Sequence, residues 1–166
     1  MHDPTQLTDN LSRLFRDHLG RTLNEAVVVR SPGRMNLLGE HTDYNGGFVL
    51  PIAIDRSTWV VAAPAEGQVR VWSEARGELD VFAPGRIRRD EERLWANYVR
   101  AVAWTLEEQF GPAPGADVLI TGDLPLGSGV SSSASLEVGA ALAFLGVTQR
   151  EMPLRDVALM CQRAEN

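Results

Sequence analysis

The stretch Leu124-Pro-Leu-Gly-Ser-Gly-Val-Ser-Ser-Ser-Ala-Ser-Leu136 decides how the rest of the chain is interpreted. An apolar run at residues 116–121 precedes it and predicts a buried strand, and the apolar-periodic run after it predicts a helix. This order of strand, glycine-rich loop and helix directs unpaired backbone N–H groups and the positive end of the helix dipole at one point. A polyphosphate suits such a point, and a serine hydroxyl there could ligate magnesium, which prefers oxygen ligands.

The simplest alternative for this stretch is a flexible Gly-Ser-Gly turn followed by serines that cap the helix. Two common phosphate loops are excluded. A Walker A loop needs Gly-Lys-Ser/Thr, but the chain has no lysine, and its 16 basic residues are all arginine. A dinucleotide fingerprint needs a third glycine and a downstream acid, which Gly127 and Gly129 lack.

The composition excludes several classes of protein. The 166 residues are enough for one domain with a substantial core. A net charge of −6 argues against a nucleic-acid partner. A single cysteine, Cys161, excludes an internal disulfide framework. There is no apolar run near membrane-spanning length and no cleavable signal, so we expect a cytoplasmic protein without a membrane partner.

Hydrophobic patterning predicts an α+β domain. The expected helices are 4–19, 94–110, a helix that follows the serines and ends before Gly146, and a last helix from about Leu154. The helix at 94–110 is expected to present one apolar face made of Leu94, Trp95, Tyr98, Val99, Val102 and Leu106. The expected strands are 26–30, buried on both faces, and 55–64, 68–73, 77–82 and 116–121.

A second informative stretch spans residues 30–54 and mixes charged groups with apolar residues. Charges in such surroundings are costly to desolvate unless they are paired or meet a polar ligand. Glu40, His41 and Asp43 offer hydrogen-bond acceptors on one short loop, which suits the hydroxyl groups of a sugar. Arg34 could balance the acids or stabilise charge on a reacting group. Taken singly, these residues could equally be a loop histidine with satisfied hydrogen bonds and a solvated turn.

Both stretches resemble known kinase motifs. Pro-x-Gly-x-Gly-x-Ser-Ser-Ser resembles the phosphate loop of the GHMP kinases. Residues 33–45 closely resemble the galactokinase signature Gly-Arg-x-Asn-Leu-Ile-Gly-Glu-His-Thr-Asp-Tyr-Asn, and depart from it only at Leu38. The resemblance implies a GHMP kinase N-terminal domain, with a ribosomal protein S5 domain 2-like fold, over residues 1–166. Its galactose-binding signature would be 30–54 and its phosphate loop 124–135.

The resemblance also implies roles for individual residues. Galactose hydroxyls would contact Glu40, His41, Thr42 and Asp43, and Arg34 would lie near the transferred phosphoryl group. ATP would contact Ser73, Gly127, Ser128, Gly129, Val130, Ser131, Ser132 and Ser133. Mg²⁺ would be held by Ser133 and Glu165, because Gln162-Arg-Ala-Glu-Asn166 resembles the segment whose glutamate ligates magnesium in galactokinases. The run from Trp95 to Val99 also resembles galactokinases, without an assigned role.

The implied activity is transfer of the γ-phosphoryl group of ATP to the anomeric hydroxyl of galactose, the entry to Leloir galactose metabolism, by a monomer. Two alternatives remain open, namely a kinase for a related sugar such as N-acetylgalactosamine or arabinose, and a non-catalytic galactose/ATP-binding sensor. In galactokinases the catalytic aspartate lies in a later Gly-Ile-Met-Asp-Gln-like motif, and most of a second domain follows. The domain is therefore expected to be incomplete, and the 166-residue chain alone is expected to be inactive.

Overall fold

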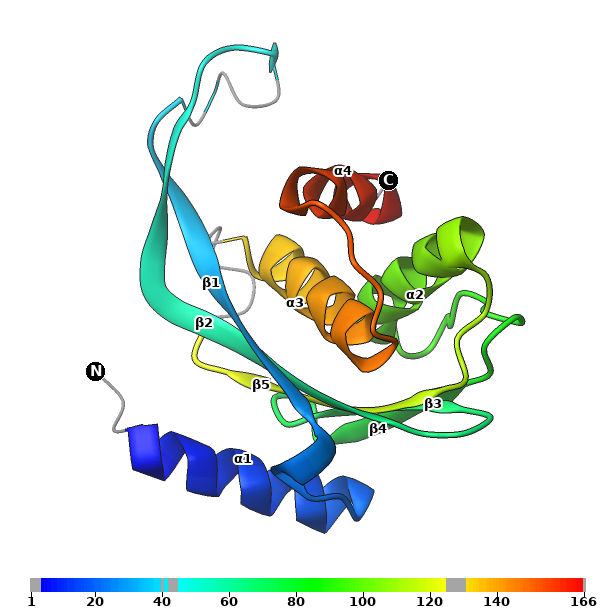
Figure 1. Cartoon of the computed structure of the whole chain (residues 1–166). Coiled ribbons are helices and arrows are strands. Elements are labelled where there is room, and N and C mark those ends of the chain that lie inside the picture. Colours follow the sequence, from blue (N-terminus) through cyan, green and yellow to red (C-terminus); the bar gives the residue numbers. More distant parts are fainter. Residues whose placement is uncertain (1–3, 40, 42–44, 125–130, 166) are drawn as a thin grey trace.

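The fold is that of a computed structural model, which describes residues 4–39, 41, 45–124 and 131–165. The described strands form one sheet in the order β1-β2-β5-β3-β4 (Figure 1). Neighbouring strands are antiparallel, except that β3 and β5 are parallel. The bounds are Val27–Leu38 for β1, Leu50–Pro64 for β2, Val69–Ser73 for β3, Glu78–Phe82 for β4 and Ala116–Gly122 for β5.

Helices cover both faces of this sheet. α1 (Pro4–Leu19) lies on one face, and α2 (Ala96–Phe110) and α3 (Ser132–Val147) lie on the other, with α4 (Leu154–Glu165) packed outside α2 and α3 (Figure 1). A 3₁₀ turn, η1, spans Leu23–Glu25. None of the helices in the described part of the chain is long and apolar enough to cross a bilayer. The predicted α+β class is confirmed.

The central strand β5 is buried from Ala116 to Thr121 because both of its faces are covered. Val118 and Ile120 join the core shared with α2, α3 and α4, whereas Leu119 joins the core beneath α1. This alternation is the period-2 pattern of a strand with two packed faces. The predicted buried strand before the phosphate loop is therefore confirmed, and β5 ends beside the first turn of α3.

The strand expected at residues 26–30 differs from the prediction. β1 lies at the edge of the sheet, and Val28 remains 43% exposed, so this segment is not buried on both faces. β1 also continues through Leu38, so that residues 31–38 of the galactokinase-like signature extend the strand beyond its predicted end at Arg30. The register shifts between Pro32 and Arg34, at a bulge where a residue without an N–H is tolerated.

α3 is seated unusually close to β1 and β2. A Cβ atom added at Gly139 would lie 3.0 Å from Cγ2 of Val60, and one added at Gly146 would lie 3.0 Å from Cγ1 of Val27. The helix continues past Gly146 to Val147, so the predicted helix end at this glycine is wrong. Gly146 is instead a point where the helix backbone approaches β1.

α2 begins at Ala96, and half of its predicted apolar face is confirmed, since Val99, Val102 and Leu106 are buried. Leu94 and Tyr98, which were expected on the same face, are 58% and 38% exposed. A buried ion pair joins α2 to β4, with Arg100 Nη2 2.7 Å from Asp80 Oδ1 and Arg100 Nε 2.9 Å from Asp80 Oδ2.

Gly139→Ala should destabilise the protein by about 1–3 kcal/mol, the usual cost of adding a methyl group to a packed core. Val60 is fully buried, so its side chain would have to shift within a packed core to accept the new methyl group. Helix propensity acts in the opposite direction, since alanine favours a helix by about 0.8–1.0 kcal/mol over glycine. Urea unfolding measures whether Gly139→Ala lowers or raises the free energy of unfolding. Gly146→Ala is the matched control with a smaller expected loss, because Val27 is only half-buried on the edge strand. A gain in stability from Gly139→Ala would contradict the close seating.

Candidate functional site

The first turn of α3 has an unusual backbone. Ser131, directly before the helix, adopts the left-handed conformation with φ 58° and ψ 46°, which is uncommon for a residue other than glycine. Its side chain makes no capping hydrogen bond within the described structure. The alternative of serines that merely cap the helix therefore finds no support at Ser131. Strained backbone of this kind is often found where a loop contacts a ligand. The predicted ATP-binding residues Gly127, Ser128, Gly129 and Val130 lie outside the described residues.

The two predicted magnesium ligands lie together, although they are far apart in the sequence. Ser133 Oγ donates a hydrogen bond to Glu165 Oε1 at 2.9 Å, which joins the start of α3 to the end of α4. Both are hard oxygen ligands. Mg²⁺ commonly uses one or two protein oxygens together with water and substrate phosphates. No cluster of three or more His, Cys, Asp or Glu side chains suited to a metal is found in residues 4–39, 41, 45–124 and 131–165.

A second pair of side chains, Glu137 and Cys161, lies one helical turn deeper between α3 and α4. Glu137 follows Ser133 by one turn of α3 and is 1% exposed, and Cys161 precedes Glu165 by one turn of α4 and is 3% exposed. Burial, with a smaller contribution from the charge of Glu165, raises the pKa of Glu137 to about 7. Burial, followed by the charge of Glu137, raises the pKa of the Cys161 thiol to about 12. Among the described atoms, Glu137 Oε1 has no hydrogen-bond partner.

A cavity of about 310 Å³ opens beside the serines of α3. Ser73, the last residue of β3, lines it together with Ser132 and Ser133, so predicted ATP contacts from separate elements share one cavity. The volume falls within the usual range for small-molecule sites, about 300–1,000 Å³. The other lining residues come from β2, β5, α2, α3 and three connecting segments: Thr58, Ala75, Arg76, Trp95, Tyr98, Ile120, Thr121, Gly122, Leu124 and Leu136.

Sequence reasoning assigned no role to three residues of this cavity: Arg76, Trp95 and Tyr98. The Trp95 indole is held in place, because its Nε1 donates to Glu78 Oε2 at 2.7 Å. Aromatic faces and a guanidinium group both stack on flat rings. The galactokinase-like run from Trp95 to Val99 was the available signal. Its apolar residues, taken at helical spacing, suggested core packing instead.

The sugar signature is only partly described. Arg34 lies in β1, half-buried and opposite Ala53 of β2. His41 is exposed, and its carbonyl accepts a hydrogen bond from Asn45 Nδ2 at 2.8 Å. The predicted contacts Glu40, Thr42 and Asp43 lie outside the described residues. The ends of β1 and β2 that carry this signature project beyond the other strands (Figure 1).

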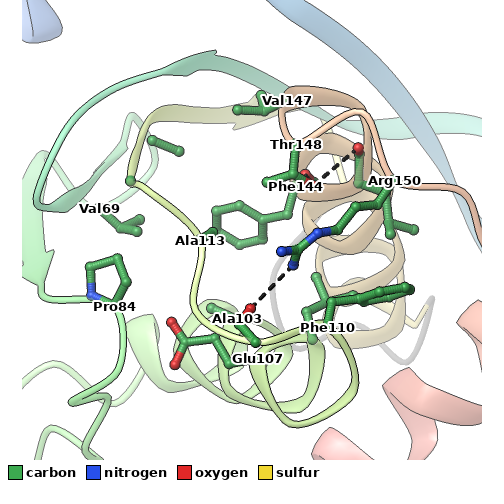
Figure 2. Close-up of a pocket in the computed structure, with 15 residues that line it drawn as sticks. Val69, Pro84, Ala103, Glu107, Phe110, Ala113, Phe144, Val147, Thr148 and Arg150 are labelled. Atoms are coloured by element: carbon green, nitrogen blue, oxygen red, sulfur yellow. Dashed lines mark hydrogen bonds between the residues drawn. The ribbon is translucent and has the colours of Figure 1, made fainter.

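A smaller cavity lies at the opposite end of α3 and contains none of the predicted site residues (Figure 2). Its volume of about 30 Å³ suits a single water molecule. Its charged groups already have partners: Arg150 Nη1 donates to Gly111 O at 3.2 Å, and Glu107 accepts from Gly85 N at 3.0 Å. The candidate site is therefore at the N-terminal end of α3.

The chain is similar to known proteins in both sequence and structure. Residues 13–64 match the family model of the galactokinase galactose-binding signature, and residues 97–166 match that of the GHMP kinase N-terminal domain. A galactokinase of Roseiflexus sp. (strain RS-1) is 44% identical over 160 residues, which is 96% of this chain. The chain belongs to the GHMP kinase family. A galactokinase of Chloroflexus aggregans is 47% identical over 140 residues, which is 84% of this chain.

Solved structures show the same fold. The galactokinase of Lactococcus lactis, crystallised with galactose, superposes with a TM-score of 0.87 at 32% identity. The match covers 96% of this chain. A mevalonate kinase superposes at 0.76 with 18% identity over 84% of the chain, which shows a shared fold. The chain spans 40% and 36% of the length of the two curated relatives, and 42% of the L. lactis enzyme.

Glu137→Gln should make the protein more stable at pH 8 and change its stability much less at pH 5. The raised pKa means that folded Glu137 keeps a proton that the unfolded chain releases near pH 4.5. The stabilising contribution of that proton is complete below about pH 4.5 and is lost as the pH rises through about 7. Glutamine stays neutral, so the variant escapes this loss.

Urea midpoints at the two pH values measure the effect. Glu108→Gln, on the exposed face of α2, is the control that removes the same charge without burial. A difference between Glu137→Gln and the parent that does not change with pH would mean that Glu137 is solvated in the folded protein.

Proposed function

We propose that this chain forms the nucleotide- and sugar-binding part of a galactokinase, which transfers the γ-phosphoryl group of ATP to the anomeric hydroxyl of galactose. The observation that carries the proposal is the hydrogen bond from Ser133 to Glu165 at the N-terminal end of α3. The galactose-binding signature at residues 13–64 and the curated relatives named galactokinase support the sugar assignment.

The phosphates of ATP would bind at the start of α3. Backbone N–H groups there meet the positive end of the helix dipole, an arrangement that favours anions. The hydroxyl groups of Ser131, Ser132 and Ser133 add further donors. The chain carries a net charge of −6, so phosphate must be bound by these local groups and not by a basic surface. The base would enter the 310 Å³ cavity beside Ser73, where Trp95 and Arg76 can stack on it.

Ser133 and Glu165 would hold Mg²⁺ in place of their mutual hydrogen bond. The ion would neutralise negative charge on the phosphate oxygens, the contribution usual in phosphoryl transfer. Glu165, as the anionic member of the pair, would provide most of the electrostatic attraction, and Ser133 would fix the ligand geometry from the helix. The neutral form of Glu137 below them avoids a buried negative charge beside the exposed Glu165, which would be costly without a partner.

The sugar would bind at the projecting ends of β1 and β2. Glu40 and Asp43 would accept hydrogen bonds from galactose hydroxyls, with His41 and Thr42 completing the contacts. Arg34, half-buried in β1, would stabilise negative charge on the transferred phosphoryl group. Because transfer depends mainly on positioning, this strand and the start of α3 must keep a fixed relation.

Galactose should be the preferred sugar of the full-length kinase that carries this chain. The test follows ADP formation from ATP and Mg²⁺ with galactose, N-acetylgalactosamine or arabinose, each over a range of concentrations. We expect the highest kcat/KM with galactose and a kcat in the ordinary enzyme range, about 1–10³ per second. A higher kcat/KM for another sugar would change the substrate. Binding of ATP and galactose without turnover would identify a sensor.

Ser133→Ala and Glu165→Gln should both weaken ATP turnover in a magnesium-dependent way. Each removes one proposed ligand but leaves the backbone of α3 free to bind phosphate. A weakened metal site refills by mass action, so raising Mg²⁺ should restore much of the lost activity. ATP affinity and turnover across a magnesium titration measure this.

Ser132→Ala is the matched control for this titration, since Ser132 lines the same cavity one residue away. Its defect should not depend on magnesium. If Ser133→Ala and Glu165→Gln respond to magnesium only as the parent does, these residues do not hold the ion.

A further inference from the structure

Ser135 connects three elements of the fold at one point. It lies in α3, two residues after Ser133, and is 4% exposed. Its Oγ donates to the backbone carbonyl of Ser31 in β1 at 2.7 Å, and a second hydrogen bond of 3.1 Å joins it to Thr58 Oγ1 in β2. Ser31 and Thr58 are themselves directly opposite each other in the β1–β2 ladder. The helix is therefore bonded to both strands at a single rung.

This junction lies between the two halves of the candidate site. On the strand side, Arg34 follows Ser31 by three residues in the edge strand β1. On the helix side, Ser132 and Ser133 line the nucleotide cavity, and Thr58 lines it as well. Ser135 is absent from the lining of that cavity in the described structure, so it would act through the helix and not by touching a ligand.

The other contacts between α3 and the strands do not fix its position as tightly. At Gly139 the helix faces the side chain of Val60 and the Cβ atom of Ser31. Apolar contacts of this kind are not directional. A hydrogen bond between buried groups is directional, and its loss leaves a polar group unsatisfied. Sliding or rotation of α3 along the strands would therefore be opposed mainly at Ser135.

We propose that Ser135 is a positioning residue for phosphoryl transfer. It fixes the phosphate-binding end of α3 at one rung of the β1–β2 ladder, so that a phosphoryl group bound at the serines stays in reach of Arg34 and the sugar signature. The inference rests on the proposed function. Displacements near 1 Å far from the reacting atoms can lower a rate by about 10²-fold, so a single junction can matter this much.

The test compares Ser135→Ala with the parent in the full-length kinase, using the sugar on which the parent is most active. We expect kcat to fall on the order of 10²-fold. The separate dissociation constants of Mg-ATP and of the sugar, measured by calorimetry, should stay within about twofold, since each half of the site remains intact. A purely structural role would instead lower stability without separating kcat from binding.

Three further variants control this experiment. Thr105→Val removes another buried hydroxyl, one that donates to Ala101 O within α2, and should leave kcat unchanged. Ser135→Thr keeps a hydroxyl at the junction and should recover part of the lost kcat. If Ser135→Ala folds poorly, Thr58→Val removes one of the two bonds from the strand side and should give a smaller fall in kcat with unchanged sugar affinity.

An unchanged kcat in Ser135→Ala, or an equal loss of both binding constants without a fall in kcat, would overturn the positioning role while leaving the proposed function intact. A parent that phosphorylates a sugar other than galactose would overturn the galactose assignment alone, because the variants are compared on that other sugar. A parent without turnover on any sugar would overturn both.

Discussion

The close seating of α3 on β1 and β2 is the contact on which the rest of the site depends. Gly139 allows the helix backbone to approach within van der Waals contact of Val60, where a Cβ atom would lie only 3.0 Å away. At this short separation Ser135 can reach the carbonyl of Ser31. One helix thus carries the serine-rich turn at its N-terminus and contacts, along its side, the strand that carries Arg34.

The interface between α3 and α4 is the second contact that shapes the candidate site. Its outer layer pairs Ser133 with Glu165, and its inner layer buries Glu137 beside Cys161. A buried carboxyl group without a partner opposes folding at neutral pH. Local features that cost stability often mark functional sites, where several requirements compete. Here the acid lies one turn below the end of α3 that is proposed to hold phosphate and metal, and its raised pKa limits the charge placed near Glu165.

Much of the fold follows from local patterns. The bounds of α1, the buried strand β5 and the order of strand, loop and helix were predicted because periodicity and flanking glycines act locally. The edge position of β1 was not predictable, since it depends on which strands pair. Gly146 was misread as a helix end because its role comes from Val27, more than a hundred residues away in the sequence. The buried ion pair between Arg100 and Asp80 was not predictable either, because it joins two separate elements.

In the candidate site, too, some features could be predicted from the sequence and others depend on contacts between separate elements. The contact between Ser133 and Glu165 could be proposed only through a family resemblance, because spacing alone presents Glu165 as a surface residue. Ser135 lies within the predicted phosphate loop of 124–135 but was assigned no contact there, and Glu137 gave no signal, since a glutamate within a helix is ordinary. Their significance appears only once α3 is packed against β1, β2 and α4.

The most direct measurement is a crystal structure of the full-length kinase with galactose, Mg²⁺ and a non-hydrolysable ATP analogue. The account predicts Mg²⁺ about 2.0–2.1 Å from Ser133 Oγ and a Glu165 carboxylate oxygen. It also predicts phosphates at the first turn of α3, and the hydrogen bond from Ser135 to Ser31 preserved. A metal held by other residues, or a triphosphate bound away from the N-terminus of α3, would contradict it.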